Sequence, residues 1–160
     1  MRALPSDNRH WSVLERLPIR DKVFFFETAI REHPLALSAT EFPLFHHFSH
    51  GLYARELHVP KGMITIGKIH KYPCLNILAK GDRSTLIGDM IVRIQAPYID
   101  VSPAGTKRIT YTHEDSVWIT VHATTETDVE KLEHELVAET EQEYQEFCRM
   151  VKAETHKCLL

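Results

Sequence analysis

Histidine is the residue type with the most chemistry to offer in this sequence, at 11 of 160 residues. An unperturbed imidazole titrates near neutral pH, so it can act as an acid, a base or a metal ligand. Neutral imidazole together with carboxylate suits Mn, Fe, Ni or Zn. The count alone suggests a metal centre or acid–base chemistry, and the spacing of the histidines must distinguish the two.

Two histidines share a predicted strand face with a second functional side chain. Side chains two or four residues apart on a strand point the same way. Trp118 and His122 therefore share a face. Facing inward they would line a pocket, whereas facing outward Trp118 would cover a surface or an interface. Glu56 and His58 share a face in the same manner on an earlier strand.

A basic pair, Lys107 and Arg108, follows a turn that ends at Gly105. The guanidinium fork of an arginine at such a position can bind the carboxylate or phosphate of a small ligand. The alternative is a structural ion pair with Glu56 or Asp115. The sequence leaves both interpretations open.

A second histidine group, His46, His47 and His50, lies beside Phe45 and Phe48. Two histidines four residues apart on a helix can bind a metal, but no third ligand is assured here. The aromatic neighbours favour a packing segment.

Short β-strands are the elements that must position these residues. Turn signals such as Pro60-Lys61-Gly62 and Lys80-Gly81-Asp82 punctuate the apolar stretches from residue 51 to 124. Strands with no helix between them predict a sandwich or barrel, because a parallel sheet needs crossover helices. The predicted strands are 53–59, 63–70, 74–80, 83–87, 90–95, 98–102, 106–112 and 116–123.

Helical segments flank the β region. Asp21 is predicted to cap a helix that ends at Arg31, although Val23–Phe26 could instead be a buried strand. A helix from about 128 to 153, with Thr127 as its cap, carries an apolar stripe and an acidic face that we expect to be solvated. The predicted organisation is one compact domain with an N-terminal helical strap at 1–50, a barrel at 51–124 and an acidic amphipathic helix at 125–160.

Length and composition exclude several classes of protein. A chain that is 43% hydrophobic and 26% charged is neither disordered nor low in complexity. No apolar run approaches the roughly 20 residues that span a bilayer, and we expect no signal peptide. Three cysteines without a CxxC pair favour reduced thiols and exclude a zinc cluster built on cysteine pairs. Thinly spread basic residues argue against nucleic-acid binding.

The β region resembles a cupin, a small double-stranded jelly-roll barrel. The resemblance rests on GKIHKYPCLNILAKGD and on APYIDVSPAGTKRITYTHEDSVWITVH. Within these stretches and just before them, Gly62, Gly81, Pro103 and Gly105 match the glycines and the proline of the two cupin motifs. More narrowly, the pattern is similar to small cupin-like proteins of phages and bacteria. The resemblance covers about 75 residues, and it implies a mainly β fold built on one such barrel.

The resemblance also indicates which positions hold the metal ligands in cupins. This sequence has other residues at most of those positions. Of the three histidines and one carboxylate of the cupin pattern, only His70 is present. Tyr72 stands at the second histidine position, Asn76 or Cys74 at the carboxylate position, and Arg108 at the third histidine position. A cation at a ligand position repels a divalent metal. We therefore expect the usual metal centre to be degenerate.

Three functions fit this pattern. The first is a barrel that binds a small anionic ligand without a metal cofactor. The second is a metal-dependent enzyme, an oxygenase or isomerase, with an Fe, Mn, Ni or Zn site rebuilt from His70, His122, His58 and Glu56. The third is a structural or assembly component of a phage particle that uses the barrel as a scaffold. The residues predicted to bind the ligand in the first case are His70, Tyr72, Asn76, Arg108, Trp118 and His122.

The sequence also leads to expectations about partners and cellular location. Edge strands and the amphipathic helix favour a homo-oligomer, most simply a dimer. Virion proteins are further partners if the chain is phage-encoded, and neither nucleic acid nor membrane is expected. The expected location is the cytoplasm, either of a host cell or within a virion.

Overall fold

The computed structural model describes residues 18–34, 36, 41–87 and 90–157. Its contacts divide the chain into two compact units, residues 1–37 and residues 38–160. In the first unit, helix α2 (Ile19–Arg31) ends where the sequence predicted. Pro18 precedes the helix as its N-cap residue, and Asp21 lies in its first turn instead of capping it. The alternative of a buried strand at 23–26 is therefore wrong.

The second unit is built on a five-stranded antiparallel sheet, which we call sheet A. Its strands are paired in the order β1-β2-β10-β5-β8. Four of them match predicted strands closely, and the fifth, β1, lies in the segment expected to be a strap. Their bounds are β1 Leu44–Ser49, β2 Leu52–Val59, β5 Cys74–Lys80, β8 Tyr98–Ser102 and β10 Ser116–Ala123.

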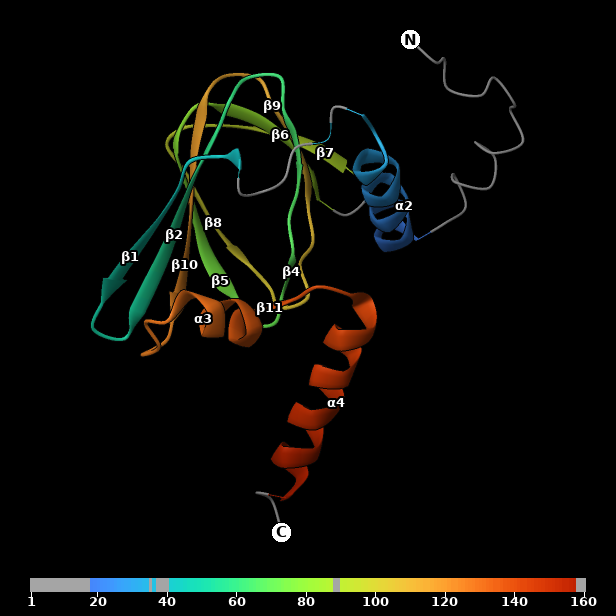
Figure 1. Cartoon of the computed structure of the whole chain (residues 1–160), viewed down its shortest axis with the longest axis vertical. Helices are drawn as coiled ribbons and strands as arrows, with labels where there is room; N and C mark the ends of the chain where they lie inside the picture. Colours follow the sequence, from blue (N-terminus) through green and yellow to red (C-terminus); the bar gives the residue numbers. More distant parts are fainter. Residues whose placement is uncertain (1–17, 35, 37–40, 88–89, 158–160) are drawn as a thin grey trace. The chain divides into compact units, whose positions relative to one another are not determined.

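A four-stranded antiparallel sheet, sheet B, faces the inner side of sheet A (Figure 1). Its order is β3-β9-β6-β7. The bounds are β3 Ile64–Ile66, β6 Asp82–Ile87, β7 Met90–Gln95 and β9 Ile109–Thr112. The strand predicted at 63–70 is split, because the chain leaves sheet B after Ile66 and continues as β4 (Ile69–His70). Two facing antiparallel sheets confirm the predicted mainly β, cupin-type jelly-roll arrangement.

The C-terminal segment differs from the single helix predicted from about 128 to 153. It forms helix α3 (Val129–Leu136), strand β11 (Val137–Ala138) and helix α4 (Glu141–Lys157). Asp128, not Thr127, caps α3, and its carboxylate accepts hydrogen bonds from the backbone of the first turn. The helix is interrupted because β11 pairs with β4 and buries Ala138 completely. None of the helices in the described residues is both long and apolar enough to cross a membrane.

This C-terminal segment is docked on one end of the barrel. Leu132 and Leu136 of α3 form a buried cluster with Tyr53 of β2. The backbone of Lys71 donates to the Leu136 carbonyl at 2.8 Å, and the Lys71 ammonium lies 2.8 Å from Glu143 of α4. Apolar burial and backbone pairing therefore fix the end of the barrel at which His70 lies.

Candidate functional site

The register of sheet A decides which side chains face the interior. Directly opposed residues of antiparallel strands project from the same face. One inward row contains Tyr53, His122 and Cys74 with Ser102, and the next contains Arg55, Thr120, Asn76 and Asp100. A third row follows at Leu57, Trp118, Leu78 and Tyr98. Polar groups therefore occupy most of the first two rows, where a barrel of this size would ordinarily bury apolar side chains.

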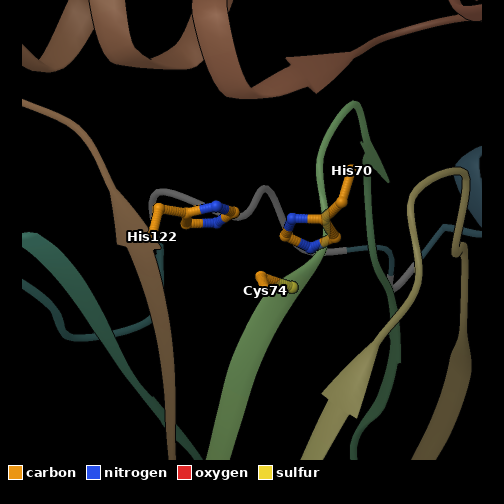
Figure 2. Close-up of side chains that lie close together, drawn as sticks. All are labelled: His70, Cys74 and His122. Carbon is orange, nitrogen blue, oxygen red and sulfur yellow. The ribbon is translucent and has the colours of Figure 1, made fainter.

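Two residues of the first row, Cys74 and His122, lie with His70 of β4 in a group of metal-ligating side chains. His70, Cys74 and His122 each offer one ligand atom, and these atoms lie within 4.8 Å of one another. Figure 2 shows the three side chains converging from β4, β5 and β10. The imidazoles of His70 and His122 stack with their centroids 5.3 Å apart. This cluster could hold a metal ion.

Burial keeps this group uncharged. Removal from water lowers the pKa of His70 to about 4, and the nearby His122, Arg55 and Arg108 lower it further. Burial, with Arg55, also lowers the pKa of His122 to about 4. Burial raises the pKa of the Cys74 thiol. At neutral pH the site therefore presents two neutral imidazoles and a thiol.

Asn76 organises the polar row below this cluster. Its amide nitrogen donates to Ser102 Oγ at 2.7 Å. Its amide oxygen accepts from Thr120 Oγ1 at 3.2 Å and from the Cys74 thiol at 3.9 Å. Both polar atoms of the Asn76 side chain have partners, so this residue links β5 to β8 and β10 at the level of the site.

Arg83 enters the interior from sheet B. Its guanidinium lies 5.2 Å from the centre of the Trp118 ring and donates to Thr65 Oγ1 at 3.0 Å. Only 4% of the residue is exposed, and this burial lowers the pKa of Arg83 to about 10. The group remains a cation at neutral pH, held against an aromatic face.

Arg108 meets the interior carboxylate, Asp100. Its Nη2 donates to Asp100 Oδ2 at 2.7 Å, with both side chains mostly buried. The partner foreseen for a structural ion pair was Glu56 or Asp115, and the structure pairs Arg108 with neither. Asp100 Oδ1 is buried without a hydrogen-bond partner, so half of the carboxylate is unused.

Unpartnered polar atoms gather in this interior. Among the described residues, five buried side-chain atoms have no hydrogen-bond partner: Arg55 Nε, His70 Nδ1, Arg83 Nε, Asp100 Oδ1 and Thr112 Oγ1. The five lie on inward positions, since Thr112 pairs in register with Arg83 on sheet B. Leaving a buried polar atom unpaired costs about 1–3 kcal/mol. These five atoms are therefore the ones in the described interior whose hydrogen-bonding capacity the described side chains leave unused.

Three predicted residues lie elsewhere. Tyr72 is 42% exposed and packs edge-on against Phe147 of α4, with ring centroids 5.2 Å apart. Glu56 and His58 lie on the outer face of sheet A, where one Glu56 oxygen bonds His58 at 2.6 Å and the other bonds His47 at 2.8 Å. The structure therefore does not bring Glu56 and His58 to His70 and His122.

The sequence reasoning missed two interior arginines, Arg55 and Arg83. Arg55 sits between Ala54 and Glu56, so strand alternation puts it on the face opposite Glu56 and His58. The pairing of His122 with Tyr53 settles which face is inward, and a sequence does not contain that register. A buried cation beside Trp118 has no local sequence signal either, since β6 and β10 are far apart in the chain.

Comparison with known proteins finds similarity among solved structures alone. No protein-family model matches the sequence, and no curated protein matches it. Among solved structures, the chain is similar to KdgF from Halomonas sp., with 16% identity, a TM-score of 0.48 and coverage of 62% of this chain and 93% of that one. It is also similar to a cupin-2 domain protein from Shewanella frigidimarina, at 12% identity and a TM-score of 0.43, over 68% and 95% of the two chains. An acetylacetone dioxygenase from Acinetobacter johnsonii matches at 15% identity and a TM-score of 0.43, over 57% and 74%.

Proposed function

We propose that this barrel binds a small anionic ligand between its two sheets. The observation that carries the proposal is the group of five buried, unpartnered polar atoms on inward positions, two of which belong to arginines. A ligand oxygen could accept hydrogen bonds from Arg55 Nε and Arg83 Nε. The same atoms would otherwise remain unpaired in a region closed to water.

The charge of the interior supports an anion. Arg55, Arg83 and Arg108 face it from three strands or turns, and Asp100 is the carboxylate opposite Arg108. Glu133 of α3 is close enough to Arg55 for that cation to contribute to lowering the Glu133 pKa, but Glu133 is bonded to Lys68. A buried cation without a matching anion is costly, and a carboxylate or phosphate would supply one.

Hydroxyl and aromatic groups around Arg83 suit a compact polar anion. The register of sheet B places Thr65, Thr85, Thr110 and Thr112 on the same face as Arg83. The Trp118 ring lies 5.2 Å from the Arg83 guanidinium. The hydroxyls can donate or accept as the ligand requires. A mono- or dicarboxylate, or a phosphate ester of similar size, fits this donor set best.

The test is a thermal-shift screen of untagged protein against citrate, succinate, inorganic phosphate, glucose 6-phosphate and AMP, followed by calorimetry of any hit. A ligand that binds only the folded chain, at about 100 times its Kd, stabilises that chain by about 2.7 kcal/mol. We expect at least one anion to give a saturable rise in melting temperature. Replacing Arg83 with methionine should abolish that rise.

Arg149→Met is the matched control, because Arg149 is exposed on α4 and bonds only its own helix. That variant should keep the ligand response of the wild-type chain. A screen with no saturable response contradicts the proposal, and so does a response that Arg83→Met retains in full.

A further inference from the structure

The metal centre that the cupin resemblance implies does not fit this chain. Of the four matching positions, the first offers His70, and the carboxylate position offers either Cys74 or Asn76. Tyr72 packs outward on α4, and the amide of Asn76 bonds Ser102 and Thr120. Arg108 is bonded to Asp100. A centre of three imidazoles and one carboxylate therefore cannot form at these positions.

A different set of three ligands lies at the first inward row of sheet A, where His70 of β4 meets Cys74 and His122. His70, Cys74 and His122 form the one group of three histidine, cysteine or acidic side chains in the described residues whose ligand atoms are close enough to share an ion. Cys74 comes from β5 and His122 from β10, and His122 corresponds to none of the four family positions. The trio is therefore not the set of ligands that the cupin pattern implies.

We propose that His70, Cys74 and His122 form a three-ligand site for a thiophilic metal ion, with Zn²⁺ as the reference ion. A thiolate with two imidazoles is a donor set that soft and borderline ions prefer, whereas Mg²⁺ and Mn²⁺ prefer oxygen. Three protein ligands leave the fourth tetrahedral position open for water or an anion. This site goes beyond the anion-binding proposal and does not depend on it.

Two observations show that the ligands are ready to bind. His70 Nδ1 is buried and has no hydrogen-bond partner, so a metal would satisfy an atom that is otherwise unpaired. Cys74 is 3% exposed, and the contact of its thiol with Asn76 restrains the side chain beneath the rings.

The charge balance is compatible with a divalent ion. Arg108 and Arg55 both lie close enough to the cluster to help lower the pKa of His70. Asp100 offsets the charge of Arg108 at 2.7 Å, and Glu133 of α3 lies near Arg55. Binding replaces the Cys74 S–H bond with a sulfur–metal bond and releases one proton to the buffer. The resulting thiolate removes one of the two positive charges that the ion brings. Affinity should therefore rise with pH, as it does for any thiolate site.

The experiment uses the full-length chain without an affinity tag, freed of metal with a chelator. Equilibrium dialysis against Zn²⁺ with elemental analysis gives stoichiometry and affinity, and Co²⁺ serves as a spectroscopic probe of sulfur ligation. We expect one ion per chain and a sulfur-to-cobalt charge-transfer absorption. Cys74→Ser should abolish that absorption and, like His122→Ala, weaken Zn²⁺ binding by at least about 100-fold, beyond the 10- to 100-fold typical of residues that only orient a ligand.

Two control variants match these changes. Cys148→Ser removes a free thiol of α4, and His58→Ala removes an imidazole of the outer face. Both variants should bind Zn²⁺ with wild-type affinity. Arg83→Met should also keep the wild-type affinity for Zn²⁺, even if it no longer binds an anion. The proposal is overturned by binding below one equivalent, by a cobalt complex without sulfur ligation, or by Zn²⁺ affinity that survives Cys74→Ser.

A measurement on the native ligands covers the case in which Cys74→Ser does not fold. In a Cys148→Ser, Cys158→Ser background, Cys74 is the remaining thiol. The rate at which the Cys74 thiol is alkylated is measured in mild urea, at a concentration that lets the metal-free chain react. Zn²⁺ at about 100 times its Kd should slow this alkylation about 100-fold, because only the metal-free fraction reacts. An alkylation rate that Zn²⁺ leaves unchanged overturns the proposal.

Discussion

The imidazole rings of His70 and His122 stack with their centroids 5.3 Å apart and 21° from parallel, and both rings are largely buried. They come from β4 and β10, and β4 is held in place by β11 of the C-terminal segment. Two imidazolium ions at this separation would repel one another in a region of low dielectric. The relationship therefore requires at least one ring to be neutral, and burial lowers the pKa of both rings to about 4.

The first prediction is a loss of stability in mild acid. The folded-state pKa of about 4 for each ring lies below the unfolded value of 6.5. The unfolded chain therefore binds more protons between these values, and the free energy of unfolding falls as the pH falls through 6.5. From pH 7.5 to pH 5 each ring should cost about 2 kcal/mol. Urea denaturation across this range measures the effect.

The control for this prediction separates the contribution of the two rings to the pH dependence from that of the carboxylates. Several carboxylates also lose stabilising interactions in acid. His122→Gln should flatten the pH dependence between 7.5 and 5 by about 2 kcal/mol. His50→Gln, at an exposed position, should leave it as in the wild type. Equal slopes for wild type and His122→Gln would show that this ring is not held neutral.

The second prediction concerns two turn glycines with similar backbone angles. Gly62 has a φ of +84° with open space at its Cβ position, and Gly81 has a φ of +96° with the Ser116 Cβ only 2.7 Å from that position. An alanine at either position would have to adopt a positive φ, which costs an L residue about 1–2 kcal/mol. Gly81→Ala must also displace the start of β10, so we expect a total loss of at least about 3 kcal/mol. Thermal unfolding of the two variants, compared with wild type, tests the difference.

The third prediction separates apolar from ionic docking of the C-terminal segment. Leu132 is 2% exposed and packs with Tyr53 and Leu136, so Leu132→Ala should lower the free energy of unfolding by about 2–4 kcal/mol. Lys68 bonds Glu133 and Glu139 at a solvent-exposed edge, so Lys68→Met should cost less than about 1 kcal/mol. Denaturation curves at low and high salt give both values. A larger loss for Lys68→Met than for Leu132→Ala would show that ion pairs hold the segment.

The strands were the most predictable part of this molecule. Alternating apolar residues and turn glycines locate β5 and β10 to the residue, because those signals lie within the strands themselves. The helix break at β11 is different in kind. Residues 128–153 carry a continuous helical pattern, and only the pairing of β11 with the distant β4 shows why the chain leaves it. Tertiary pairing overrides local preference at that point.

The sequence predicted the types of residue in the candidate site, but only some of the particular residues that form it. His70 and His122 lie together as the inward interpretation of β10 requires. Cys74 instead of Asn76 contacts them, because the side chain of Asn76 lies one row deeper, with Thr120 and Asp100. Glu56 and His58 were placed on one face correctly, but the register with β10 puts that face outside. Such a distinction needs the pairing of strands and not their sequence.

The most direct test of the central proposal, an anion held between the sheets, uses Trp118 as a reporter. Its ring lies 5.2 Å from the Arg83 guanidinium, and Trp11→Phe removes the other tryptophan of the sequence. In that variant, titration with citrate or inorganic phosphate should give a saturable change in Trp118 emission. The change should disappear when Arg83→Met is added. Emission that is indifferent to every anion, or that changes equally without the Arg83 guanidinium, would contradict an anion site in this barrel.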